Sequence, residues 1–132
     1  MPLKKVLVVD DEVHIVHVVA IKLRNNGYEA IVAGNGAEAY DLACKELPDI
    51  IIADYMMPVM DGLELIEKLR KTESTKDIPV ILLTARNFAI NDARQEQLRI
   101  SQCITKPFSP KELLRTIEDV IYQGTTALVG QS

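Results

Sequence analysis

The stretch IIIADYMMPVMDG, residues 50–62, decides the fold of this chain. An unbroken apolar run leads into Asp54, and a methionine-rich turn then leads to Asp61-Gly62. A short apolar run of this kind is typical of a parallel β-strand that is covered on both faces. The Asp-Gly pair is typical of a turn at which a helix begins. The stretch therefore predicts a buried strand that ends in a carboxylate and is followed by a helix.

Segments of the same two kinds alternate along the rest of the chain. The strand candidates are residues 5–11, 28–34, 49–54, 79–84 and 102–106. The helix candidates are residues 12–27, 37–46, 62–72, 85–101 and 109–121. The last of these opens with the capping box Ser109-Pro110-Lys111-Glu112. This alternation predicts an α/β fold in which five helices cover both faces of a five-stranded parallel sheet.

The composition is that of an ordinary globular domain. The 132 residues are 48% hydrophobic and 26% charged, with a formal net charge of −4. This charge argues against nucleic acid or an anionic membrane as a ligand, since both require clustered Lys and Arg. No apolar run approaches the roughly 20 residues of a membrane-spanning helix. We expect a cytoplasmic domain over residues 4–122, a flexible tail without helix over residues 123–132, and reduced thiols at Cys44 and Cys103.

Polar residues stand where four of the predicted strands end. They are Asp10 and Asp11, Asp54, Thr84 and Lys106. Carboxyl ends of parallel strands share one edge, and a strand order of 2-1-3-4-5 would bring these side chains into one crevice. Carboxylates that lie close together repel, and Mg²⁺ with its preference for oxygen ligands would relieve this. A carboxylate can attack phosphorus, with a lysine and a hydroxyl stabilising the phosphoryl oxygens.

The chain resembles the receiver domain of two-component response regulators, a group that includes the single-domain chemotaxis receiver. The resemblance rests on VVDDE (8–12), IIIADYMMPVMDG (50–62), ILLTA (81–85) and ITKPF (104–108). It extends over nearly the whole chain, and the combination of segments is highly specific. It implies a flavodoxin-like, doubly wound sheet of order 2-1-3-4-5 and a signalling phosphoacceptor that catalyses its own phosphorylation and dephosphorylation. By the same resemblance the protein is not an enzyme in the usual sense.

The resemblance also implies a role for the acidic residues. Asp54 would be the phosphoacceptor and would help to bind Mg²⁺. Asp11 would bind the metal directly and Asp10 largely through water. The backbone carbonyl of Met56 would be a further ligand.

The remaining implied roles concern the phosphoryl group and its donor. Thr84 would bond a phosphoryl oxygen, and Lys106 would form an ion pair with it, next to a cis peptide at Pro107. The donor would be a sensor histidine kinase or a histidine phosphotransfer protein, and phosphorylation would switch binding to a downstream protein. The first helix is the usual docking surface for the kinase in this family. Three of its residues are therefore candidate contacts: His14, Ile15 and Val18.

The chain departs from the family pattern at positions that affect signalling. Cys103 stands three residues before Lys106, where receivers usually carry a Tyr or Phe, which puts the usual coupling of the switch to its output surface in doubt. Met56 and Arg86 would flank the phosphoryl group. A methionine cannot orient an attacking water by a strong hydrogen bond, and an arginine can reach phosphoryl oxygens. We therefore expect a long-lived phosphoryl state.

Other readings of the same residues remain open. Taken alone, each of Asp10, Asp11 and Asp54 is also typical of a solvated loop or a helix cap. The His14/His17 pair is typical of a surface helix. A haloacid-dehalogenase type of enzyme would need a DxDx[TV] pattern after the first strand, which residues 10–14 do not match. A flavodoxin-like cofactor binder would need a Ser/Thr/Gly-rich phosphate loop at the same place. The third alternative is a receiver that no longer takes phosphate.

Overall fold

The five strands form one parallel sheet in the order β2-β1-β3-β4-β5, which confirms the predicted topology. The computed structural model describes residues 4–85 and 90–130, with side chains as far as residue 122. The strands are β1 (Lys5–Val9), β2 (Glu29–Ala33), β3 (Ile50–Asp54), β4 (Val80–Thr84) and β5 (Ile100–Thr105). The helices are α1 (Val13–Asn25), α2 (Gly36–Glu46), α3 (Gly62–Arg70), α4 (Asp92–Gln97) and α5 (Pro110–Gly130).

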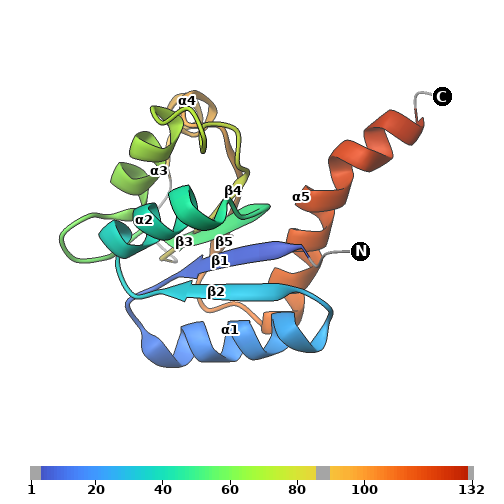
Figure 1. Ribbon diagram of the computed structural model, residues 1–132, viewed down its shortest axis with the longest axis horizontal. Helices are drawn as coiled ribbons and strands as arrows, with labels where there is room; N and C mark the ends of the chain where they lie inside the picture. The colour runs from blue at the N-terminus through green and yellow to red at the C-terminus, as the bar shows by residue number, and fades with distance from the viewer. Residues whose placement is uncertain (1–3, 86–89, 131–132) are drawn as a thin grey trace.

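The sheet lies between two helical layers, with α1 and α5 on one face and α2, α3 and α4 on the other (Figure 1). All five residues of β3 are buried, as the apolar run predicts. Alternate side chains serve opposite faces. Ile50 and Ile52 pack in the cluster that contains Val19 of α1 and Ile117 of α5. Their neighbour Ile51 packs in the cluster that contains residues of α2 and α3. The body of β3 is therefore held from both sides, which fixes the position of its carboxyl end.

Helix α3 begins with a complete capping box immediately after the loop that follows β3. The Asp61 carboxylate accepts a hydrogen bond from the Glu64 amide at 2.9 Å, and the Glu64 carboxylate accepts one from the Asp61 amide at 3.1 Å. At the start of α5, Ser109 Oγ accepts from the Glu112 amide at 3.0 Å, as the sequence predicts. Local side-chain chemistry therefore sets where both helices start.

The prediction of one helix over residues 85–101 is wrong. Helix α4 spans only Asp92–Gln97, and β5 already begins at Ile100 and ends at Thr105. Residues 86–89 lie outside the described part of the chain. Strand β5 starts at Ile100 because this residue pairs with Val80 of β4. The next residue of β4, Ile81, pairs with Gln102, so one extra residue bulges out of β5 between the two pairs. Ile100 is buried by the sheet and is not part of a helix face.

Polar contacts hold the α4–β5 region in place. None of the residues of α4 is buried. The Arg70 guanidinium of α3 donates instead to a set of carbonyls that flank this region, those of Lys76, Ile78, Leu98 and Arg99. Arg94 of α4 bonds Glu67 of α3 at 2.8 Å. This part of the fold depends on side-chain hydrogen bonds between distant segments, which hydrophobic periodicity does not report.

The prediction that the chain has no helix after residue 122 is also wrong. Helix α5 continues to Gly130, and its C-terminal part extends beyond the sheet (Figure 1). Once a helix has formed, each added residue contributes a further hydrogen bond at little extra cost, so a single glycine does not end it. Within the described residues, no helix combines the length and the apolar character that crossing a bilayer requires.

Candidate functional site

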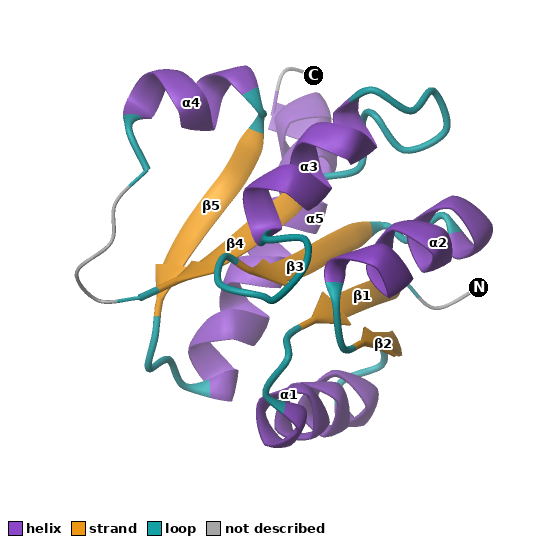
Figure 2. Ribbon diagram, turned by 90° about the vertical axis from the view of Figure 1, so that its left-hand side faces the viewer, coloured by secondary structure: helices purple, strands orange, loops and turns teal. Residues whose placement is uncertain are grey.

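The carboxyl ends of β1, β3, β4 and β5 bring the predicted polar residues to one edge of the sheet. Figure 2 shows these strand ends side by side. Asp10, Asp54 and Thr84 are the polar residues buried there, with exposed fractions of 1%, 5% and 4%. Asp54 is the last residue of β3, and it pairs in register with Leu83 of β4. The sheet order thus produces the crevice that the sequence predicted, because β1 and β4 both neighbour β3.

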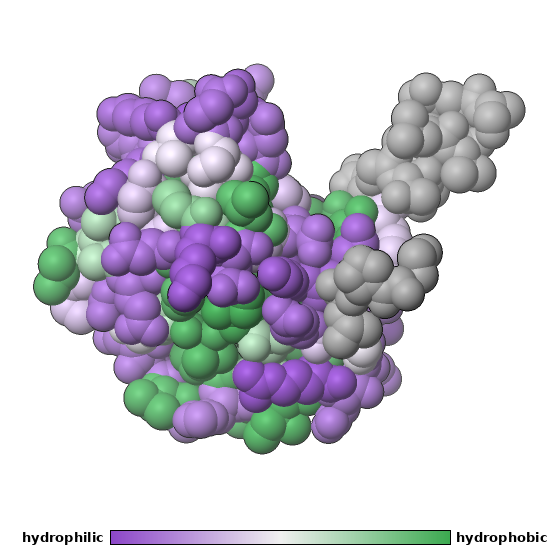
Figure 3. Space-filling view, in the orientation of Figure 1, coloured by the Kyte–Doolittle hydropathy of each residue, from purple (hydrophilic) through white to green (hydrophobic). Residues whose placement is uncertain are grey.

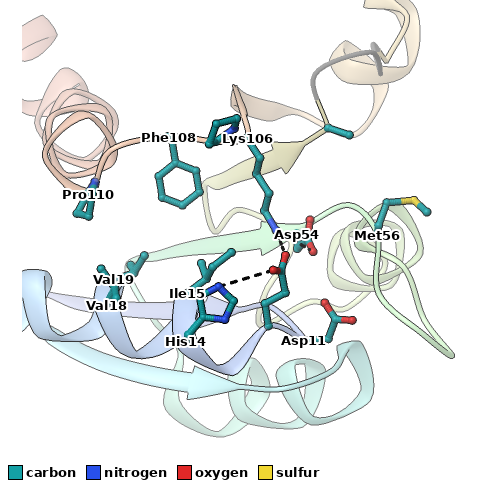
Figure 4. Close-up of a pocket in the computed structure, with 13 residues that line it drawn as sticks. Asp11, His14, Ile15, Val18, Val19, Asp54, Met56, Lys106, Phe108 and Pro110 are labelled. Carbon is teal, nitrogen blue, oxygen red and sulfur yellow. Dashed lines mark hydrogen bonds and ion pairs between the residues drawn. The ribbon is translucent and has the colours of Figure 1, made fainter.

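Lys106 reaches into this crevice from the loop after β5. Its Nζ lies 2.8 Å from Asp10 Oδ2 and 3.2 Å from Asp54 Oδ2. A third carboxylate, that of Glu12, lies 3.2 Å away. Figure 4 shows the lysine side chain extended toward Asp54. The ammonium group therefore neutralises part of a negative cluster at the sheet edge.

The electrostatics of the site follow from burial and from this cluster. Burial raises the pKa of Asp54 to about 6; the neighbouring charge of Asp10 adds to the shift, and Lys106 partly opposes it. Burial alone would lower the pKa of Lys106. Its hydrogen bond to Asp10 and the charges of Asp54 and Asp10 outweigh that effect, so the pKa of Lys106 is raised. The lysine stays charged, and Asp54 lacks full compensation for its own charge.

The oxygen atoms of Asp10, Glu12 and Asp54 form a group suited to a hard cation. One carboxylate oxygen from each lies within 4.8 Å of the others. Mg²⁺ prefers oxygen ligands of this kind. Asp11, the predicted direct ligand, lies outside this group. It is exposed and lines a cavity that also contains Glu12 and Asp54. Glu12 was not among the predicted site residues. The signal that could have found it is the third consecutive acid of VVDDE.

Thr84 and Lys106 are connected through the backbone. The Lys106 amide donates to the Thr84 carbonyl at 2.7 Å, and the Thr84 hydroxyl lies 3.5 Å from the Ile104 carbonyl. The Lys106-Pro107 peptide is cis, as the family resemblance implies. The strand ends of β4 and β5 are thus joined directly beside Asp54.

A family model for the response regulator receiver domain matches residues 6–118. The chain belongs to this family. Receiver domains are the signalling phosphoacceptors of two-component systems, and they interact with histidine kinases and downstream effectors. The acidic cluster around Asp54 fits the phosphorylation site of such a domain.

Relatives and solved structures agree with this assignment. The receiver is 38% identical to the phosphate regulon transcriptional regulatory protein PhoB of Pseudomonas aeruginosa. The 118 aligned residues cover 89% of this chain and 52% of PhoB. The alkaline phosphatase synthesis regulator PhoP of Bacillus subtilis is 36% identical over 94% of this chain and 51% of its own. The chain therefore spans about half the length of the curated relatives it matches. Chemotaxis protein CheY4 of Vibrio cholerae superposes with a TM-score of 0.83 at 33% identity, covering 90% of this chain and 99% of CheY4.

A cavity of about 760 Å³ opens from the acidic cluster of the receiver toward α1 and the start of α5 (Figure 4). Its polar end contains Asp11, Glu12, Asp54 and Lys106, and Met56, whose exposed fraction is 64%, lies beside it. Its apolar end is lined by Ile15, Val18, Val19, Phe108 and Pro110. The Ile15 and Val18 predicted to contact a partner therefore border the route to Asp54. Arg86, the second residue predicted to control the phosphoryl lifetime, lies outside the described residues.

Cys103 lies in β5 on the face of the sheet opposite to α1 and α5. It is half-buried and packs against the cluster that contains Leu82 and Ile100. Burial raises the pKa of its thiol. Cys44 and Cys103 are both free thiols. Cys103 is thus a small side chain that contributes to packing on this face of the sheet.

Proposed function

We propose that this receiver domain accepts a phosphoryl group on Asp54 in a Mg²⁺-dependent two-component phosphorelay. The observation that supports it most directly is the environment of the Asp54 carboxylate. The carboxylate is buried at the sheet edge, 3.2 Å from the Lys106 ammonium, and it lines a cavity of about 760 Å³. At neutral pH a group with a pKa of about 6 is mostly ionised, as a nucleophile must be.

The reaction is a transfer between two protein side chains. An Asp54 carboxylate oxygen attacks the phosphorus of a phosphohistidine; the new P–O bond forms as the P–N bond breaks. The donor's imidazole nitrogen keeps the electron pair of the broken bond and is protonated from solvent. Lys106 is near enough to bind a phosphoryl oxygen, and Thr84, which is buried at the same edge of the sheet, would bind another once its hydroxyl leaves the Ile104 carbonyl. Such positioning supplies most of the catalysis in phosphoryl transfer.

Magnesium would be held by Asp10, Asp11, Asp54 and the backbone carbonyl of Met56. Asp10 and Asp54 fit this role, because their carboxylate oxygens lie within 4.8 Å of each other and of a Glu12 oxygen, and the three carboxylates carry more negative charge than Lys106 alone balances. Asp11 and Met56 line the adjoining cavity. When bound, the cation supplies charge neutralisation for the carboxylates and the phosphoryl oxygens. The side chains of this chain provide the rest of the site.

The partners proposed for the domain follow from its family. The donor is a sensor histidine kinase or a histidine phosphotransfer protein that contacts His14, Ile15 and Val18 beside the cavity. Val18 and His14 are both exposed, with side-chain exposure of 78% for His14. Phosphorylation then switches binding of a downstream protein. The PhoB and PhoP relatives are transcriptional regulators by name, and an output of that kind is one such downstream role for a longer protein.

Intact-mass measurement tests the proposal. The domain is incubated with acetyl phosphate and Mg²⁺, and we expect one phosphoryl adduct that disappears in EDTA and in Asp54→Ala. Asp41→Ala is the matched control, because Asp41 is an exposed aspartate on α2, and it should keep the adduct. An adduct that persists in Asp54→Ala would reject Asp54 as the acceptor. Absence of any adduct in the wild type would favour a receiver that no longer takes phosphate.

A further inference from the structure

The Lys106 ammonium is bound by three carboxylates, one for each of its N–H donors. Its Nζ donates to Asp10 at 2.8 Å and to Glu12 at 3.2 Å, and it lies 3.2 Å from Asp54. Its side chain is only 19% exposed. Phosphorylation removes the charge of the Asp54 carboxyl group and frees the donor that faces it. A second N–H donor reaches the phosphoryl oxygens only when Asp10 or Glu12 releases it.

The three partners differ in how readily they can leave. The Asp10 side chain is fully buried, and its second oxygen accepts from the Glu12 amide at 3.0 Å. The Glu12 side chain is 47% exposed. An exposed carboxylate regains water when it leaves, whereas a buried one loses its partner without compensation. Of the two partners that phosphorylation does not itself alter, Glu12 is therefore the one whose release costs less.

Glu12 also occupies a position that usually has another task. It is the N-cap residue of α1, where a side chain commonly accepts from the amides of the first turn. Its backbone carbonyl accepts from the Ile15 and Val16 amides. Within the described residues, however, its side chain makes no capping hydrogen bond and turns to Lys106, 94 residues away in sequence. Its other oxygen lies 3.9 Å from Nε2 of the exposed His14 ring.

We propose that Glu12 is a positioning residue that holds Lys106 in the unphosphorylated domain and releases it to the incoming phosphoryl group. The inference rests on the proposed function of Asp54. While Glu12 is bound, it keeps the lysine extended over the carboxylates. On phosphorylation, the phosphoryl oxygen takes the donor that Glu12 gives up. Glu12 thus competes with the phosphoryl group and sets how strongly the site retains it.

Glu12→Gln tests this competition, because the amide keeps the shape but loses the charge that attracts the ammonium. Beryllium trifluoride, a stable phosphoryl analogue, is titrated into the Mg²⁺-saturated domain and followed by ¹⁹F NMR. We expect the variant to bind it about two- to five-fold more tightly, the range typical of one partly exposed ion pair. Glu38→Gln is the control: Glu38 is exposed in the first turn of α2, and its replacement changes the net charge equally.

A second measurement examines Lys106 directly and needs no phosphoryl analogue. In the metal-free wild type, the bound ammonium should give a ¹⁵N NMR signal protected from exchange, assigned by its loss in Lys106→Met. This signal should weaken in Glu12→Gln and stay unchanged in Glu38→Gln. A structural role of Glu12 at the start of α1 would not alter it selectively.

The outcomes distinguish the role of Glu12 from the proposed function of Asp54. Tighter analogue binding together with a weakened Lys106 signal supports the role of Glu12. Tighter binding with an unchanged signal would mean that Glu12 only repels anions, and it would overturn the inference, as would unchanged or weaker binding. Phosphorylation of Asp54 by acetyl phosphate in the wild type would then leave the proposed function intact. A wild type that binds neither the analogue nor a phosphoryl group would overturn both.

Discussion

The backbone of Gly62 lies directly against that of Asp54. A Cβ built on Gly62 would be 2.6 Å from the Asp54 carbonyl oxygen and 2.9 Å from Leu82 Cδ1. The Gly62 amide also donates to the Tyr55 carbonyl at 2.9 Å. The first turn of α3 thus approaches the end of β3 more closely than any side chain would permit. The glycine of the MDG segment is what allows the proposed phosphoacceptor and the helix after it to pack together.

Gly62→Ala should destabilise the domain by about 2 kcal/mol or more, because the backbone atoms it would meet cannot move aside. Urea unfolding measures this. Gly34→Ala is the matched control, since nothing lies within 4 Å of a Cβ there. Equal stability of the two variants would show that α3 can shift away from β3 without loss.

Replacing Val59 should stabilise the protein. Val59 has φ of 70° and is 95% exposed, so it has a strained backbone and almost no packing to lose. Asparagine adopts this conformation far more readily, and we expect Val59→Asn to raise the free energy of unfolding by about 1 kcal/mol. Val18→Asn, at an exposed position inside α1, should instead lower it slightly. A loss of stability in Val59→Asn would contradict the strain argument.

Asp54→Asn should stabilise the metal-free domain at neutral pH. The pKa of Asp54 is raised to about 6 in the folded state, so the carboxyl group ionises at lower pH in the unfolded chain than in the folded one. The free energy of unfolding therefore falls as pH rises from about 4 to 6. Removing the charge should recover about 1–2 kcal/mol above pH 6, since water and Lys106 screen part of the effect. The gain should vanish below pH 4, and Mg²⁺ should reduce it. Thermal unfolding with and without EDTA, across this pH range, measures both effects.

Met56→Asn should shorten the lifetime of the phosphoryl group on Asp54. Met56 is exposed beside the cavity, and its thioether cannot orient an attacking water as an amide can. One added hydrogen bond to the water should speed release of inorganic phosphate about two- to ten-fold. Phosphate release after removal of acetyl phosphate measures the rate, with Val59→Asn as a control in the same loop. Unchanged release would assign the lifetime to other residues.

The sequence alone determined the parts of this protein that obey local rules. The apolar run of residues 50–53 specified a strand buried on both faces. The polar residues at four predicted strand ends indicated where Asp10, Asp54, Thr84 and Lys106 would meet. This works because hydrophobic periodicity reports burial, and parallel strands share one edge. The motif spacing was sufficient to indicate the family.

The relationships between distant residues depend on the assembled fold. In sequence Glu12 is only the third acid of VVDDE, and its bond to Lys106 exists because β1 and the loop after β5 converge at the same edge. The short α4 and early β5 likewise depend on Arg70 and on a bulge between strands. Such contacts are set by the direction in which side chains leave converging elements. That direction is a property of the assembled fold, and no periodicity along the chain encodes it.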